Sequence, residues 1–156
     1  MAERLGEELL DAWVDISISV INERLVTMLT YKEALVCNVL RRAGSVVGSD
    51  APGLTATELC RATSMVKSQM NGILTSLEEK QVVRRTRSAQ DRRRIEVLLD
   101  DGPNSLYRQQ HEALLELVDR ISRRLGADAT AETIETLGTL AKAADVEINR
   151  QLNAER

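Results

Sequence analysis

The residues most able to do chemistry in this chain are arginines that gather in one short stretch. Between Arg61 and Arg94 the sequence holds nine basic residues and three acidic ones, so this window carries a charge of +6. The remaining residues hold 12 basic and 21 acidic side chains, and the formal charge of the whole chain is −3. Guanidinium groups pair well with phosphate oxygens, and a basic surface on an acidic body is typical of a protein that binds a polyanion. The cluster therefore indicates phosphate recognition.

Residue types that support catalysis or metal binding are sparse. The chain has one histidine, His111, and two cysteines, Cys37 and Cys60, which do not form a CxxC motif. No nucleophile stands beside a base and no glycine-rich phosphate loop is present, so we expect no metal, no cofactor and no enzyme activity. Both cysteines lie in apolar-periodic stretches, which favours buried, inert thiols. A thiol sensor at Cys60, near the basic region, is the alternative.

The compartment follows from what the sequence lacks. No apolar run approaches the roughly 20 residues that cross a bilayer. The opening residues, MAERLGEELL, are acidic and do not resemble a secretory signal. We therefore expect a cytoplasmic protein that does not contact a membrane.

Helices are expected ahead of the basic stretch. Apolar residues spaced by three and four predict a helix over residues 3–26. Thr30 followed by Glu33, and Thr55 followed by Glu58, match the capping box that starts a helix. Each box predicts a helix that begins directly after its threonine.

A third, longer helix is expected from Ser64 to about Lys80. Its inner face would hold apolar side chains, namely Val66, Met70, Ile73, Leu74 and Leu77. Its opposite face is small and polar, with Ser64, Lys67, Ser68, Asn71 and Thr75. Two short helices followed by a longer one with such a face are typical of a helix-turn-helix.

A basic hairpin follows this helix. Residues 82–87 and 94–99 are rich in β-forming residues, and a polar, turn-forming segment separates them. In the second run Ile95, Val97 and Leu99 fall on one face by the period of two. A hairpin that carries six arginines directly after a helix-turn-helix predicts a winged helix.

The last third of the chain is helical by the same periodicity. Apolar residues step by three and four from Tyr107 to Leu125, Gly126 interrupts the pattern, and Thr130 is expected to restart it. These helices and residues 3–26 carry long apolar stripes that need a partner, and a second copy of the chain is the simplest one.

The sequence thus predicts a mainly α fold with a small β-wing. Residues 29–100 would form a winged helix-turn-helix lobe that binds DNA, and residues 1–28 and 101–156 a helical dimerisation lobe.

Two stretches carry a resemblance to a known family. The run LEEKQVVRRTRSAQDRRRIEVLL (residues 77–99) is similar to the wing region of the MarR family of bacterial winged-helix transcription regulators, where a Leu-Glu pair, a V-x-R and an Asp-Arg-Arg recur at this spacing. The run LTYKEALVCNVL (residues 29–40) resembles the opening of the family's second helix. The resemblance implies a homodimer that binds double-stranded DNA at a palindromic operator, as a repressor associated with the nucleoid. It also implies a possible small aromatic or phenolic effector that releases the DNA.

Site residues carry over from the family one by one. The resemblance implies that Asp91 holds the wing, that Arg93 enters the minor groove, and that the recognition helix meets the major groove. Short polar side chains and lysine suit base edges in the major groove, and an arginine suits a narrow minor groove. A carboxylate at position 91 could also aim a neighbouring guanidinium through a bidentate pair. The expected DNA-binding residues are Ser64, Lys67, Ser68, Asn71, Thr75, Arg84, Arg85, Arg87, Asp91, Arg92, Arg93 and Arg94.

The chain departs from the family pattern in three places, besides a loop at residues 44–53 that is longer than typical. Gly72 stands where a large polar residue is usual, so one base or phosphate contact is missing. Gln81 replaces the glycine that ends the recognition helix, which costs about 1 kcal/mol if the position needs a positive φ. Asp100 or Asp101 is expected to cap the next helix, with Pro103 in its first turn.

An effector site and a competing function stay open. The rings available for an aromatic effector are Trp13, Tyr31, Tyr107 and His111. Core or dimer packing is the favoured interpretation of Trp13 and Tyr107, and a hydrogen-bonded place in the core is that of His111. The competing hypothesis is a winged-helix adaptor that binds protein partners and no longer reads DNA, and Gly72 is its best support.

Overall fold

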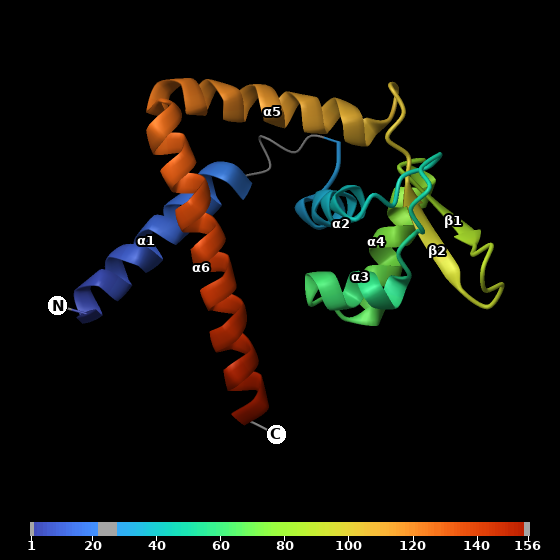
Figure 1. Ribbon diagram of the computed structural model, residues 1–156, viewed down its shortest axis with the longest axis horizontal. Coiled ribbons are helices and arrows are strands. Elements are labelled where there is room, and N and C mark those ends of the chain that lie inside the picture. The colour runs from blue at the N-terminus through green and yellow to red at the C-terminus, as the bar shows by residue number, and fades with distance from the viewer. Residues whose placement is uncertain (1, 22–27, 155–156) are drawn as a thin grey trace. The chain divides into compact units, whose positions relative to one another are not determined.

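The computed structural model describes residues 2–21 and 28–154 and divides into two compact units, residues 1–113 and 114–156. The described residues form six helices and one two-stranded antiparallel sheet. In chain order these are α1 (Ala2–Ile21), α2 (Tyr31–Arg42), α3 (Ala56–Thr63), α4 (Lys67–Glu79), β1 (Val83–Arg87), β2 (Ile95–Leu99), α5 (Leu106–Leu125) and α6 (Ala127–Ala154) (Figure 1). The fold is thus mainly α with a small β-wing, as the sequence predicted. No described helix is long and apolar enough to span a membrane.

Capping boxes start α2 and α3, as predicted. The Thr30 hydroxyl accepts a hydrogen bond from the Glu33 backbone N–H at 3.3 Å, and the Glu33 carboxylate accepts one from the Thr30 N–H at 2.7 Å. Thr55 and Glu58 repeat the pattern at 3.2 and 2.7 Å. Both threonines have extended backbones, which is the conformation an N-cap needs.

Helix α4, the third helix that the sequence predicted ahead of the hairpin, begins three residues later than predicted. Ser64 has φ +55 and caps the end of α3, so the chain turns there instead of continuing as a helix. Val66 is the N-cap of α4 and is 66% exposed, which corrects its predicted place on the inner face. The helical period does not apply to a residue that precedes the first helical turn, whereas Met70, Leu74 and Leu77 are buried as expected.

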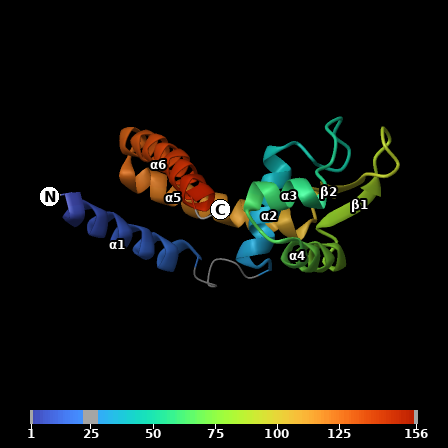
Figure 2. The same cartoon turned by 90° about the horizontal axis from the view of Figure 1, so that it is seen from below.

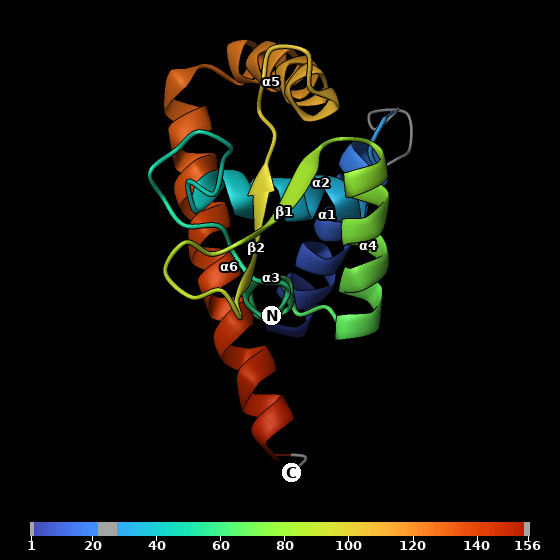
Figure 3. The same ribbon diagram turned by 90° about the vertical axis from the view of Figure 1, so that its right-hand side faces the viewer.

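The hairpin pairs β1 with β2 from Val83 opposite Leu99 to Arg87 opposite Ile95. Val46 and Leu54, in the loop between α2 and α3, join β2 through single bridges to Leu99 and Val97. The turn of the hairpin reaches beyond helices α2 to α4, as Figures 2 and 3 show. Ile95 lies near that outer end and is 55% exposed, so the predicted apolar face of β2 holds only at Val97 and Leu99.

The core of the winged helix is aliphatic, in keeping with a sequence that contains no phenylalanine. Helices α2, α3 and α4 pack their apolar faces together with the inner ends of the two strands (Figure 3). The fully buried side chains include Val36, Leu40, Leu59, Met70, Leu74, Leu77, Val82 and Leu99. This core fixes α4 and the hairpin to one scaffold.

The helices of the last third begin differently from the prediction. Ser105 caps α5, because its hydroxyl accepts the Arg108 backbone N–H at 3.0 Å, and neither Asp100 nor Asp101 does so. Pro103 precedes the helix and is not part of its first turn. Helix α6 begins at Ala127, directly after Gly126 with φ +87.

Thr130 therefore lies inside α6 and does not start it. Its hydroxyl donates to the Gly126 carbonyl at 2.7 Å, the bond of a threonine inside a helix. At the other end of the chain, α1 confirms the predicted first helix up to Ile21, and the rest of that prediction lies outside the described residues.

Candidate nucleic-acid interface

The outer face of α4 presents the small polar side chains that the sequence placed there. Lys67, Ser68, Asn71 and Thr75 are all exposed, and Ser64 is exposed in the turn that precedes the helix. The Thr75 hydroxyl donates to the Asn71 carbonyl at 2.9 Å, which fixes its orientation. Nothing lies within 4 Å of the position that a Cβ would take at residue 72, so this face is open at its centre.

Asp91 shapes the turn of the hairpin through the backbone. Its carboxylate accepts the Arg93 N–H at 2.9 Å, and its carbonyl accepts the Arg94 N–H at 2.9 Å. The Ser88 N–H closes the turn on the Arg94 carbonyl, also at 2.9 Å. Asp91 thus positions its neighbours, but the bond is to a backbone N–H and not to a guanidinium as the sequence suggested.

The six arginines of the hairpin divide into two sets. Three are held by carboxylates: the ion pairs join Arg84 to Asp100 at 2.8 Å, Arg85 to Glu78 at 3.2 Å and Arg94 to Glu58 at 2.9 Å. The other three are exposed and form no ion pair within residues 2–21 and 28–154: Arg87, Arg92 and Arg93. The positive charge available to a ligand is therefore concentrated at the outer end of the hairpin.

Glu33 is an organising residue that the sequence revealed only as a helix cap. Its buried carboxylate accepts hydrogen bonds from the Lys80 ammonium at 2.8 Å and from the Ser76 hydroxyl at 2.7 Å. Burial raises the pKa of Glu33, but the bonds from Lys80, Ser76 and Thr30 outweigh burial and hold the pKa below its ordinary value. The start of α2 is thereby tied to the end of the recognition helix.

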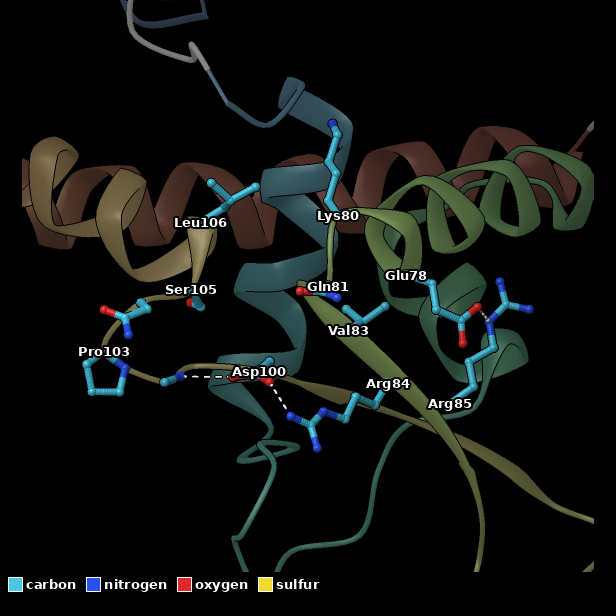
Figure 4. Close-up of a pocket in the computed structure, with 12 residues that line it drawn as sticks. Glu78, Lys80, Gln81, Val83, Arg84, Arg85, Asp100, Pro103, Ser105 and Leu106 are labelled. Atoms are coloured by element: carbon cyan, nitrogen blue, oxygen red, sulfur yellow. Dashed lines mark hydrogen bonds and ion pairs between the residues drawn. The ribbon is translucent and has the colours of Figure 1, made fainter.

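A pocket of about 770 Å³ opens beside the end of α4 (Figure 4). Its lining comes from the end of α4, from β1 and from the segment that leads into α5. In this lining Arg84 is paired with Asp100, and Arg85 turns to Glu78 (Figure 4). Its arginines are thus already neutralised by the chain's own carboxylates.

The four rings expected at an effector site do not line this pocket. Tyr107 is buried, stacks on His111 with ring centroids 5.4 Å apart, and donates to the Asn38 side chain at 3.2 Å. Burial raises the pKa of Tyr107 and lowers that of His111. Trp13 and Tyr31 are 55% and 50% exposed. The structure thus brings Tyr107 and His111 together, and the effector role of all four stays a prediction.

The cysteines differ in exposure. Cys37 is fully buried in the core, as predicted, and burial raises the pKa of its thiol to about 12. Cys60 is half-buried at the edge of the core. Among the described residues no group of three or more histidine, cysteine, aspartate or glutamate side chains could hold a metal ion.

The fold and this face define a winged helix-turn-helix protein, with a recognition helix and an arginine-bearing hairpin on one scaffold. Residues 37–94 match the model of the MarR family. This match confirms, over these residues, the resemblance that was drawn from the sequence.

Solved structures share the fold. The transcriptional regulator BldR from Sulfolobus solfataricus matches with a TM-score of 0.67 and 20% identity, over 92% of this chain and 99% of that one. CouR, a transcriptional repressor bound to a 23-mer DNA duplex, matches with a TM-score of 0.67 and 24% identity, over 90% and 94%. FabT of Streptococcus pneumoniae in complex with DNA matches with a TM-score of 0.64 and 20% identity, over 93% and 98%. A comparison with curated proteins gave no match.

Proposed function

We propose that this chain is a sequence-specific regulator of transcription that binds double-stranded DNA as a homodimer. The observation that carries the proposal is the set of unpaired, exposed guanidiniums at the outer end of the hairpin, on the same scaffold as the polar face of α4. A helix with short polar side chains fits the major groove, and an arginine on a thin hairpin fits the narrow minor groove. CouR and FabT, which share the fold, were solved with DNA.

Dimerisation is supported by apolar side chains that the chain leaves uncovered. On α5 one face carries Leu115, Val118, Ile121 and Leu125, each between 46% and 53% exposed. Helix α1 carries a similar stripe with Leu5, Leu9, Trp13 and Ile16, each between 52% and 61% exposed. Stripes of this kind need a partner, and a twofold dimer would place two recognition helices about 34 Å apart, one turn of the duplex.

The finer picture is a repressor that works on a palindromic operator in the bacterial cytoplasm, on the nucleoid. A small aromatic or phenolic effector that prefers a differently spaced dimer would release the DNA by population shift. Residues 1–28 and 101–156 would form the dimerisation lobe and residues 29–100 the DNA-binding lobe. Helix α5 connects the two, since its first turns are buried against the winged helix at Tyr107 and Gln110.

The test is a fluorescence anisotropy titration of the purified protein with a duplex selected from genomic fragments, at several salt concentrations. Arg93→Ala is expected to weaken binding by about 1–3 kcal/mol, the size of one good groove contact. The matched control is Arg84→Ala, which removes the same charge from a guanidinium already held by Asp100 and should have a smaller effect.

Salt dependence gives a second readout. On the outer face of α4 and in the hairpin, four cations per protomer form no ion pair with the described residues, namely Lys67, Arg87, Arg92 and Arg93. If a dimer brings all of them to phosphates, the slope of log K against log salt is about −7. Binding without this slope, or no binding to any duplex, would favour the adaptor, for which the open surface at Gly72 is the supporting observation.

A further inference from the structure

Arg94 turns away from the outer end of the hairpin, although the sequence groups it with Arg92 and Arg93. Its Nη2 donates to both carboxylate oxygens of Glu58 at 2.9 Å, and its Nε lies 3.5 Å from the Glu96 carboxylate. The side chain is 38% exposed. Arg94 therefore points toward α3.

Both carboxylates around Arg94 are themselves fixed. Glu58 belongs to the capping box of α3 and accepts hydrogen bonds from the backbone N–H and the hydroxyl of Thr55 at 2.7 and 2.8 Å. Glu96 is 8% exposed and accepts the Gly53 N–H at 3.3 Å. The guanidinium thus lies between two anchored anions, Glu58 on α3 and Glu96 on β2.

The backbone of Arg94 belongs to the turn of the hairpin. Its N–H and carbonyl close that turn on Asp91 and Ser88. One residue therefore joins the turn that carries Arg92 and Arg93 to the helix that precedes the recognition helix. This connection ties the turn of the hairpin to α3.

Electrostatics argues against a phosphate contact for Arg94. Two carboxylates face one guanidinium, so the local charge is negative and a phosphate that approached Arg94 would be repelled by Glu58 and Glu96. Because Arg94 is already neutralised by carboxylates, it would displace few counterions from the DNA on binding.

We propose that Arg94 is a positioning residue for DNA recognition, which clamps the hairpin to Glu58 so that Arg92 and Arg93 reach the duplex while α4 occupies the major groove. This inference rests on the proposed function. Without the clamp the hairpin must be ordered during binding, and we expect an affinity loss of about tenfold.

The experiment compares Arg94→Gln with Arg92→Gln, which removes the same charge from an exposed neighbour. Anisotropy titrations with the selected duplex are run over a series of salt concentrations. Both variants are expected to bind more weakly, but only Arg92→Gln should reduce the salt slope, by about one per protomer. A reduced slope for Arg94→Gln would overturn the proposal, because it would make Arg94 a phosphate contact.

Glu58→Gln gives the sharper test because its sign is diagnostic. Glutamine also completes a capping box, so α3 keeps its start. Removing a negative charge near the duplex should strengthen binding if the carboxylate only repels DNA. The clamp predicts the opposite: Glu58→Gln weakens binding, and the double variant with Arg94→Gln is no weaker than the single variants. Tighter binding by Glu58→Gln, or additive losses, would refute the clamp.

Folding and the proposed function are controlled separately. All titrations are run well below the melting transition of each variant, measured by far-ultraviolet circular dichroism. If the Arg94–Glu58 ion pair only stabilised the fold, the folded variants would bind the duplex as tightly as the wild type. That result would also refute the clamp. If the wild type itself binds no duplex, the proposed function fails; if it binds and only Arg92→Gln matters, the clamp alone fails.

Discussion

Replacing Gln81 by glycine should stabilise this protein. Gln81 follows the recognition helix with φ +57, a left-handed conformation that L side chains adopt at a cost of about 1–2 kcal/mol. The geometry is a complete Schellman motif: the Val82 N–H bonds the Leu77 carbonyl at 2.8 Å and the Gln81 N–H bonds the Glu78 carbonyl at 3.0 Å. The helix end therefore requires this φ, and the side chain at position 81 opposes it.

The net gain is smaller than the strain. Glycine loses about 0.5–1 kcal/mol more backbone entropy on folding than a residue with a side chain, which offsets part of the relief. Gln81 is exposed, so its side chain contributes little that would be lost. We expect the free energy of unfolding to rise by about 0.5–1 kcal/mol, which corresponds to about 2 °C in the melting temperature of a chain of this size.

The assay is thermal and urea unfolding at one protein concentration, because the stability of a dimer depends on concentration. Gln81→Ala is the matched control: it removes the same side chain but keeps the Cβ that opposes a positive φ. If the glycine variant is no more stable than the alanine variant, backbone strain at this helix end is not the cause and the reasoning is refuted.

Three further outcomes follow from burial, charge and space. A charged disulfide reagent should label Cys60 and leave Cys37 unlabelled in the folded protein, because burial raises the pKa of Cys37 to about 12; labelling of both before unfolding would contradict this. The folded-state pKa of Glu33 lies below the ordinary value of 4.5, so the ionised carboxylate stabilises the fold above pH 4.5, and this stabilisation is lost as the pH falls through the folded pKa. In urea unfolding, the difference in the free energy of unfolding between the wild type and Glu33→Gln should therefore become smaller as the pH is lowered through this range. Gly53→Ala should lower the free energy of unfolding by about 1–3 kcal/mol, because the added Cβ would lie 2.7 Å from the Glu96 Cβ and 2.9 Å from the Val97 carbonyl oxygen. Gly72→Ala should raise it by about 0.5–1 kcal/mol, because its Cβ would enter open space. Melting temperatures equal to that of the wild type would contradict both predictions.

The sequence predicted those features whose causes lie within a few residues. The capping boxes at Thr30 and Thr55 each need only a partner three positions later, so the starts of α2 and α3 were found correctly. The hairpin was found because its strands alternate and its turn is polar. The positive φ at Gln81 was suggested only by the family resemblance, in which a glycine ends this helix, and the structure shows it.

Features that depend on distant partners were not predictable. A threonine before an apolar stripe can cap the start of a helix, or it can lie inside a helix and donate its hydroxyl to the carbonyl four residues earlier. The turn at Gly126 starts the helix earlier, so Thr130 lies inside it and bonds to the Gly126 carbonyl. Arg94 finds its partner 36 residues earlier in the chain, and Arg84 finds its partner 16 residues later. An arginine triplet in a sequence shows charge, but it does not show which guanidiniums the protein itself neutralises.

One regularity does link the local signals to the distant contacts. Glu33 and Glu58 each complete a capping box, and each also binds a cation from a later element, Lys80 or Arg94. The N-terminal end of a helix stabilises a carboxylate in its ionised form, so a box glutamate is a fixed anion before any cation arrives. The Thr55 backbone N–H and the Arg94 guanidinium both hold the pKa of Glu58 below its ordinary value, in keeping with such a site. The two boxes thus fix the end of α4 and the turn of the hairpin to the same scaffold, which is the geometry that the proposed reading of two grooves requires.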